Sequence, residues 1–185
     1  MEDLRDCDYV YPPSVMTAFV RQYREAGAEG KFILCEPHQA FMQQVEDAGL
    51  WDELDGTLAL RSSRWWNEEG DLINLTKEVL YASRPGSAEK IKRMGVGYIG
   101  ASNIYQVLES IKLAVETVGK DNFNAEALYD AVQTLSLDVD GIEAMYTFSP
   151  TKRSSNNYFG VYYIDGARKD LFRLKEDWYP IQYKP

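Results

Sequence analysis

The sequence predicts a partial α/β fold, with parallel β-α-β units followed by a helical segment and a C-terminal antiparallel hairpin. Three observations lead to this prediction. Short apolar runs alternate with amphipathic helical patterns over the first third of the 185 residues. The middle third carries helical patterns with no strand among them, and the last third contains aromatic β-like runs. Alternating strands and helices are typical of parallel sheets, whereas consecutive β-like runs joined by short turns are typical of antiparallel ones.

Strands and helices alternate through the first third of the chain. We expect strands at 9–11, 31–35 and 56–60, and helices at 14–26 and 37–49. Ser14 is a residue type that caps helix N-termini, and Gly27 is typical of the position just after a helix. Pro37 lies in the first turn of the second helix, where proline is favoured. This order of elements predicts parallel pairing of the strands.

The later elements follow a different pattern. We expect helices at 71–83, 101–118 and 124–134, and β-like runs at 146–149, 158–164 and 171–174. Asn124 is the expected N-cap of the last helix. Asp165 and Gly166 form a dipeptide that is typical of hairpin turns, so we expect them to join the last two strands. The helical segment therefore separates a parallel piece from an antiparallel one.

The composition excludes several functional classes. The chain carries 20 Lys and Arg against 29 Asp and Glu, a net charge of −9. A surface of this sign repels phosphate backbones, so we expect no nucleic-acid partner. Two cysteines and one histidine are too few for a structural zinc site, and we expect no cofactor. No apolar run is long enough to span a membrane, and the acidic start of the sequence does not resemble a signal peptide.

Gly95, Gly97 and Gly100 have the G-x-G-x-x-G spacing of dinucleotide-binding loops. That mechanism requires a buried strand before the glycines, but the preceding residues 89–94 are highly charged. It also requires a second strand that ends in an acidic residue, and none follows at the right distance. We therefore interpret the segment as a glycine-rich turn before a helix.

Glu36 occupies a position where ligands bind in parallel sheets. It follows the apolar run 32–35 and precedes Pro37, so it lies at the carboxyl end of an expected strand. A carboxylate at this position can pair with a ligand ammonium. The alternative is a helix N-terminal carboxylate that is satisfied by its own backbone amides. The residues alone leave both interpretations open.

His38 is the only histidine of the chain, and Cys35 lies three residues before it. Near neighbours on a strand-to-helix turn rarely face each other. We therefore expect no thiol–imidazole pair here and place His38 in solvent. An α/β enzyme that uses Glu36 with His38 is one of three functional possibilities.

Aromatic side chains are candidates for the walls of a ligand cleft. Tyr11 ends the first expected strand, so it should lie at the same sheet edge as Glu36. Tyr98, Trp65 and Trp66 are further candidates, although each of them fits the hydrophobic core as well. Neighbouring side chains of an extended segment point to opposite sides, so we expect the two tryptophans to diverge.

The order of these segments resembles a known family. The run Phe19–Gly27 (FVRQYREAG) and the strand Lys31–Leu34 (KFIL) are similar to the second lobe of type I periplasmic solute-binding proteins, of the branched-chain amino acid type that serves ABC importers. The further matches are residues 56–60 with that lobe's next strand, 105–119 with the long helix of the other lobe, 123–135 with the short helix after it, and 141 onward with the closing hairpin. The resemblance covers nearly the whole chain but only the C-terminal half of the family.

The resemblance implies a division of the chain between two lobes. Residues 1–62 are expected to form a second-lobe β-α-β segment, and residues 63–137 a helical segment of the first lobe. Residues 138–185 are expected to return to the second lobe with the hairpin and the tail. The helices of 71–134 would then cover a first-lobe sheet that this sequence lacks. Their exposed apolar faces favour self-association or a partner that completes the lobe.

The resemblance also implies binding without catalysis. Glu36 matches the carboxylate with which the family holds the ligand's α-ammonium, and Tyr11 and Tyr98 fall near the cleft between the lobes. The implied function is binding of an amino acid or similar small polar solute for ABC-type import, in the periplasm, with a membrane permease as partner of the full-length protein. The alternative is a cytoplasmic ligand-sensing or interaction module on the same fold.

Overall fold

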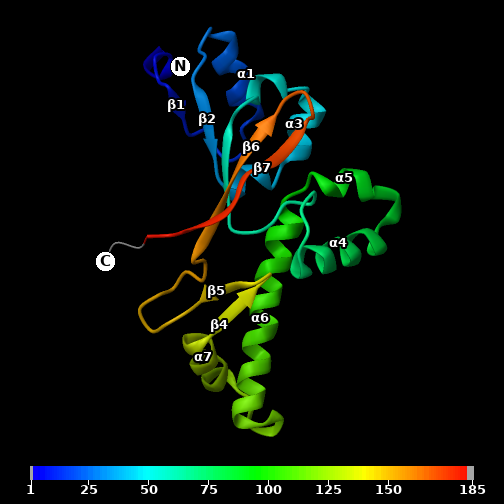
Figure 1. The fold of residues 1–185 in the computed structure, drawn as a ribbon, viewed down its shortest axis with the longest axis vertical. Helices are drawn as coiled ribbons and strands as arrows, with labels where there is room; N and C mark the ends of the chain where they lie inside the picture. The colour runs from blue at the N-terminus through cyan, green and yellow to red at the C-terminus, as the bar shows by residue number, and fades with distance from the viewer. Residues whose placement is uncertain (1, 183–185) are drawn as a thin grey trace.

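The computed structural model describes residues 2–182 and has the predicted mixed α/β architecture (Figure 1). The α-helices are α1 (Thr17–Glu25), α2 (Glu36–Gln39), α3 (Met42–Ala48), α4 (Asp71–Ser83), α5 (Ala88–Lys92), α6 (Val96–Val118) and α7 (Ala125–Thr134). Short 3-10 helices lie at Glu2–Leu4, Asp52–Leu54, Pro85–Ser87 and Lys120–Asn122. The strands are β1 (Tyr9–Val10), β2 (Lys31–Leu34), β3 (Leu58–Arg61), β4 (Ser136–Val139), β5 (Ile142–Thr147), β6 (Tyr158–Asp165) and β7 (Asp170–Pro180).

The described strands form one five-stranded sheet and one two-stranded sheet. The larger sheet has the order β1-β2-β3-β6-β7, and the smaller one pairs β4 with β5. β1, β2 and β3 are parallel, as predicted, with Ile33 opposite Leu58. β6 and β7 continue the sheet in antiparallel fashion, with Leu58 opposite Tyr163. The carboxyl ends of the three parallel strands therefore share one edge of the sheet.

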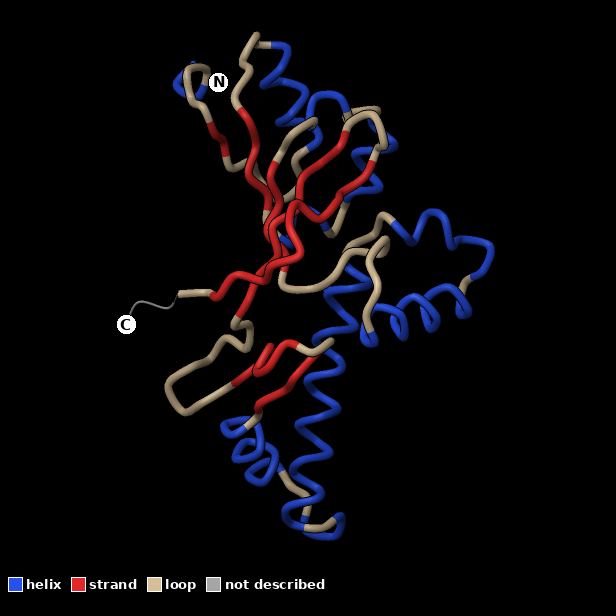
Figure 2. The backbone as a smooth tube through the Cα atoms, viewed as in Figure 1, coloured by secondary structure: helices blue, strands red, loops and turns tan. Residues whose placement is uncertain are grey.

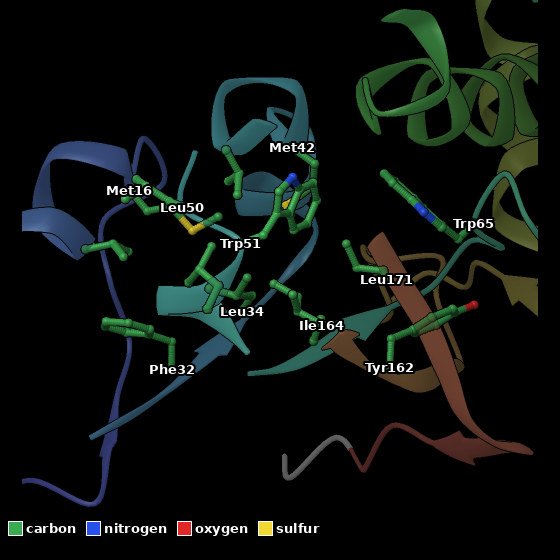
Figure 3. Packing of buried hydrophobic residues seen from close by; sticks show 14 of the residues in the cluster. Met16, Phe32, Leu34, Met42, Leu50, Trp51, Trp65, Tyr162, Ile164 and Leu171 are labelled. Atoms are coloured by element: carbon green, nitrogen blue, oxygen red, sulfur yellow. The ribbon is translucent and has the colours of Figure 1, made fainter. Parts of the chain in front are cut away.

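Helices α1 and α3 cover one face of the five-stranded sheet (Figure 3). The strands contribute alternate residues to this buried face, because successive side chains of a strand point to opposite sides. Its members include Phe32, Leu34, Ala59, Tyr162 and Ile164, all fully buried. We call this sheet, together with α1, α2 and α3, the sheet part of the molecule.

The remaining elements form an elongated second part (Figures 1 and 2). The long helix α6 runs along it and contacts both α4 and α7. The β4–β5 hairpin lies beside α6, and Tyr146 of β5 is buried. We call α4–α7 with β4 and β5 the helical part. No helix of residues 2–182 combines the length and the hydropathy that a bilayer crossing requires.

Two details of the first third differ from the prediction. Helix α1 begins at Thr17, so Ser14 is not its cap, and the preceding Met16 is buried in the core. Gly27 does follow the helix, with a φ of 74° that suits glycine. The helix expected at 37–49 is divided into α2 and α3, and Phe41 between them has a non-helical ψ of 28°.

The C-terminal strands also differ in extent from the prediction. The sequence predicted a β-like run at 146–149, whereas the structure has β5 at Ile142–Thr147 and an additional strand, β4. The loop after β6 holds four residues, 166–169, between the paired Asp165 and Asp170, rather than a two-residue turn. The Asp165 carboxylate accepts a hydrogen bond from the backbone amide of Arg168, which stabilises the longer loop. β7 continues to Pro180.

The glycine-rich segment is helical, which corrects the prediction of a turn before a helix at residue 101. Gly97 and Gly100 lie inside α6, and Gly95 is its N-cap residue. A Cβ at Gly95 would lie 2.3 Å from the carbonyl oxygen of Gln39, and a Cβ at Gly97 would lie 2.9 Å from Leu80 Cδ1. These two glycines therefore permit close packing of α6 on the sheet part and on α4.

Candidate functional site

The loops after β1, β2 and β3 meet at one edge of the five-stranded sheet. The Tyr11 hydroxyl, after β1, lies 2.8 Å from Cys35 Sγ, after β2. The Glu36 carboxylate in turn contacts Ser62 and Ser63, which follow β3. Open parallel sheets bind ligands outside the carboxyl ends of their strands, so this edge is the candidate site.

Glu36 is half-buried and its carboxylate accepts four hydrogen bonds from the loop after β3. Oε1 accepts from the Ser62 amide at 3.0 Å, the Ser63 amide at 3.2 Å and the Ser63 hydroxyl at 3.0 Å. Oε2 accepts from the Ser62 hydroxyl at 2.9 Å. Four donors match the acceptor capacity of an ionised carboxylate. The sequence left open whether backbone amides of its own helix satisfy Glu36. In the structure its donors come from Ser62 and Ser63 instead.

A buried arginine lies on the other side of Ser63. Arg61 is fully buried and donates to Ser63 O at 3.0 Å, Gln39 Oε1 at 2.7 Å and Ser63 Oγ at 2.8 Å. Its guanidinium also stacks on the Trp65 ring, 4.8 Å from the centroid. The Ser63 hydroxyl thus links the cation of Arg61 to the anion of Glu36, and opposite charges stabilise each other in a region of low dielectric. The sequence feature that could have identified Arg61 is a single cation directly after the apolar run 58–60.

Tyr11 and His38 form an aromatic pair at the same edge. The Tyr11 side chain is exposed, and its ring meets the His38 ring edge-on at 4.8 Å. The hydrogen bond with the Cys35 thiol raises the pKa of Tyr11 above its ordinary value. Tyr11 therefore presents an aromatic ring to solvent at the sheet edge that also carries Glu36, and its position in the sequence predicted this shared edge.

The expectations for His38 and Cys35 are wrong. His38 is 1% exposed rather than solvated, and its Nε2 lies 2.8 Å from the Pro12 carbonyl oxygen. Because a carbonyl only accepts, Nε2 donates this hydrogen bond, and Nδ1 accepts from the Cys35 amide at 3.1 Å. Cys35 Sγ also lies 3.4 Å from Nδ1, so thiol and imidazole do face each other. The turn of α2 folds the ring back over the end of β2.

Tyr98 lies on α6, across from the sheet edge. Its hydroxyl donates to Lys92 O at 3.0 Å and lies 3.1 Å from the Tyr81 hydroxyl, while its ring meets Trp65 edge-on at 5.6 Å. Burial raises the pKa of Tyr98 well above its ordinary value. The side chain also lines a cavity of about 20 Å³ that Ser62 and Ser63 border from the sheet part. That volume holds one water molecule.

Tyr146 and Asp170 are site neighbours that the sequence did not single out. The Tyr146 hydroxyl donates to Ser62 O at 3.3 Å, and burial raises its pKa to about 12. The Asp170 carboxylate accepts from the indole nitrogens of Trp65 at 2.7 Å and Trp66 at 2.9 Å. The expectation that the two tryptophans diverge is therefore wrong, because the chain turns at 66–67 instead of remaining extended.

The structure brings two of the three predicted site residues to one edge and places the third across a cavity. Glu36 and Tyr11 follow β2 and β1, whereas Tyr98 borders the same region from the helical part. Ser62, Ser63 and Arg61 complete the surroundings of Glu36. The arrangement offers an anchored carboxylate, hydroxyl groups that can rotate and an exposed aromatic ring.

No protein-family model and no curated protein sequence matches this chain. Solved structures do share its fold. A branched chain amino acid ABC transporter from Thermus thermophilus, solved with bound valine, matches with a TM-score of 0.67 at 14% identity, over 98% of this chain and 47% of that chain. A fatty acid ABC transporter substrate-binding protein from Thermomonospora curvata matches with a TM-score of 0.66 at 14% identity, over 98% of this chain and 45% of that chain. A leucine binding protein from Thermotoga maritima matches with a TM-score of 0.61 at 14% identity, over 90% of this chain and 43% of that chain.

The chain therefore spans less than half the length of the solved structures it matches. At this level of identity the likeness shows a shared fold. The predicted resemblance to solute-binding proteins of ABC transporters, over about half of their length, is confirmed at the level of the fold.

Proposed function

We propose that this protein binds a small polar solute that carries an ammonium group, such as an amino acid, and does so without catalysis. The single observation that carries the proposal is the position of Glu36. Its carboxylate lies half-buried at the carboxyl edge of the parallel strands, where open α/β sheets bind their ligands. The similar fold of ABC-transporter binding proteins supports the same function.

An ammonium group can reach Glu36 by replacing two of its donors. The backbone amides of Ser62 and Ser63 are fixed, but their hydroxyl groups can rotate and release one acceptor position each. An ammonium donates up to three hydrogen bonds and adds a charge that a hydroxyl lacks. Replacement of neutral donors by a cation is therefore favourable, and Arg61 fixes the Ser63 hydroxyl that contacts the carboxylate.

Tyr11 is the proposed contact for the rest of the ligand. Tyr11 is 65% exposed at the same sheet edge as Glu36, and an aromatic ring supplies contact area with little loss of conformational entropy. Tyr98, with Ser62 and Ser63, borders a cavity that is too small for an amino acid. Ligand entry on this side therefore requires the sheet part and the helical part to move apart.

We extend the proposal to the biological setting. In it, residues 1–62 and the β6–β7 hairpin belong to the second lobe of a solute-binding protein, and residues 63–137 to the first lobe. The expected return to the second lobe at residue 138 is moved to β6, because β5 pairs with β4 in the helical part. The ligand serves ABC-type import in the periplasm, and a membrane permease is the partner of the full-length protein. Support comes from the shared fold and from the location of Glu36 and Tyr11 on one part and Tyr98 on the other.

Calorimetric titration with L-valine and with N-acetyl-L-valine tests the role of the ammonium group. The two ligands share the side chain and the carboxylate, but acetylation removes the positive charge. We expect L-valine to bind and N-acetyl-L-valine to bind at least ten-fold more weakly, since a lost charge-assisted hydrogen bond is worth about 1.5–3 kcal/mol. Equal affinities, or absence of binding for a panel of free amino acids, would contradict the proposal.

A further inference from the structure

Cys35, Tyr11 and His38 form a cluster of polar side chains where β1 and β2 end, which we call the thiol cluster. Cys35 Sγ lies 2.8 Å from the Tyr11 hydroxyl and 3.4 Å from His38 Nδ1. The Cys35 side chain is half-buried, whereas His38 is buried. The proposed solute site uses the Tyr11 ring but neither the thiol nor the imidazole. The chemistry of this pair is therefore a separate question.

The Pro12 carbonyl determines where the protons of the thiol cluster lie. His38 Nε2 lies 2.8 Å from this carbonyl oxygen, which only accepts, so the neutral ring carries its proton on Nε2. Nδ1 is then an acceptor, and it accepts from the Cys35 amide at 3.1 Å. Because Nδ1 has no proton, only the thiol can donate between Sγ and Nδ1. The Tyr11 hydroxyl in turn donates to the sulfur.

This arrangement favours transfer of the thiol proton to His38. The transfer removes the neutral hydrogen bond from the Cys35 amide to Nδ1. In exchange, the Tyr11 hydroxyl and the new Nδ1–H group both contact a charged sulfur, and hydrogen bonds to a charged group are the stronger ones. The Pro12 carbonyl continues to accept from Nε2, so it stabilises the imidazolium inside the protein. A thiol next to an imidazole is one of the arrangements that make cysteine nucleophilic.

Cys7 is the second free cysteine, and it serves as an internal reference. Both thiols are half-buried, so their exposure is of the same class. Cys7 precedes β1, whereas His38 follows β2, which is parallel to β1, so the two lie at opposite edges of the sheet. Cys7 also lies between the exposed Asp6 and Asp8, and nearby carboxylates disfavour a thiolate. A difference in reactivity between the two cysteines would therefore report on the thiol cluster.

We propose that Cys35 is a modification site that exchanges with small disulfides, with His38 as the base that accepts its proton. The Cys35 thiolate attacks one sulfur of the disulfide, the S–S bond breaks, and a mixed disulfide forms at Cys35. The departing thiolate takes up the proton from His38 Nδ1. The small disulfide is reduced to one free thiol and the mixed disulfide, so it is itself the oxidant. This activity goes beyond solute binding and does not depend on it.

The reaction with an uncharged dipyridyl disulfide at pH 7, followed by the colour of the released thiopyridone, tests the proposal. We expect a fast phase from Cys35 and a slow phase from Cys7, about ten-fold apart, because an ordinary thiol is only a few per cent ionised at this pH. Cys7→Ser should keep only the fast phase, and Cys35→Ser only the slow one. In urea, which removes the cluster, the two rates should lie within about three-fold of each other.

His38→Asn in the Cys7→Ser background tests the base. Asparagine keeps an oxygen that can accept from the Cys35 amide, but this oxygen is not basic, so we expect the Cys35 rate to fall about ten-fold. Thermal unfolding establishes whether the variant is folded; if it is not, the comparison of native and urea-unfolded chains decides. A Cys35 rate no faster than that of Cys7, a ratio that persists in urea, or an unchanged rate in folded His38→Asn would each overturn the proposal.

Discussion

Glu36 is the residue on which the proposed function depends. Four donors fix its position, and two of these are hydroxyl groups that a ligand ammonium can replace. The buried Arg61 supplies the balancing charge through the Ser63 hydroxyl. A buried cation without such a partner would cost several kcal/mol, so the site and the fold depend on the same small network.

The sequence predicts the location of Glu36 but not its partners. An apolar run followed by Glu and Pro indicates a strand end and a helix start, which is local information. Ser62 and Ser63 lie 26 and 27 positions further along the chain, and only the parallel pairing of β2 with β3 brings them together. The burial of His38 could not be predicted from the local sequence either, because it depends on a hydrogen bond to the Pro12 carbonyl in another loop.

Asp170 gives a pH dependence whose sign follows from its burial. Desolvation raises the pKa of this carboxyl above its ordinary value of 3.8. Between that value and the raised one, the folded state binds more protons than the unfolded chain. The contribution of Asp170 to the free energy of unfolding is therefore largest at acidic pH and falls as the pH rises through this window.

Urea unfolding of the wild-type chain and of Asp170→Asn measures this contribution. Asparagine does not titrate, and its single amide oxygen can accept from Trp65 or from Trp66 but not from both, a loss that does not depend on pH. We expect the stability of the wild type relative to the variant to fall as the pH rises above 3.8, the ordinary pKa of the carboxyl, and through its raised pKa. A difference that stays constant or rises with pH would show that the carboxyl is not destabilised by burial.

At the scale of elements, the glycines at the start of α6 determine how closely this helix packs on its neighbours. Gly95 and Gly97 admit Gln39 and Leu80 at distances that a side chain would block, whereas Gly100 faces open space. The three glycines at the helix start made residues 95–100 resemble a turn in the sequence. Tertiary packing overrides this weak local preference, so the helix begins at Val96, five residues before the predicted start.

Replacement of single glycines by alanine separates these roles. Gly100→Ala should raise the free energy of unfolding by about 0.5–1 kcal/mol, because alanine restricts the unfolded chain and favours the helix. Gly95→Ala should lower it by about 1–3 kcal/mol through overpacking against the Gln39 carbonyl. Thermal or urea unfolding checks both, and equal effects of the two changes would contradict this division of roles.

The parallel strands could be predicted because their sequences are apolar and their connecting helices are amphipathic. The β4–β5 hairpin could not, since β4 (SLDV) alternates exposed and half-buried residues and has few apolar ones. Asp140 and Gly141 between these strands both have positive φ angles, 53° and 78°, and form the tight turn. The Asp140 carboxylate accepts from the amides of Asp71 and Leu72, so its tertiary role at the start of α4 has no local sequence signal.

At the scale of the whole molecule, two apolar surfaces stay uncovered. In the described residues 2–182, α4 and α6 border an apolar groove of about 550 Å³, and Ile33, Leu58 and Val161 on one face of the five-stranded sheet are only partly buried. The sequence predicted the first surface through its resemblance to a two-lobed family. The second surface became visible only in the structure, because no local sequence pattern shows which of the two faces of a strand is covered.

The central claim is that Glu36 holds the ammonium group of a solute between the two parts of the molecule. Calorimetric titration of L-valine into wild type and Glu36→Gln tests it most directly, with Glu46→Gln as a matched change in a carboxylate that binds Trp51 outside the site. Thermal unfolding first establishes that both variants are folded. The account predicts that Glu36→Gln weakens binding about 30-fold, a loss of about 2 kcal/mol, and that Glu46→Gln leaves it unchanged. Unchanged affinity in a folded Glu36→Gln variant would contradict the account.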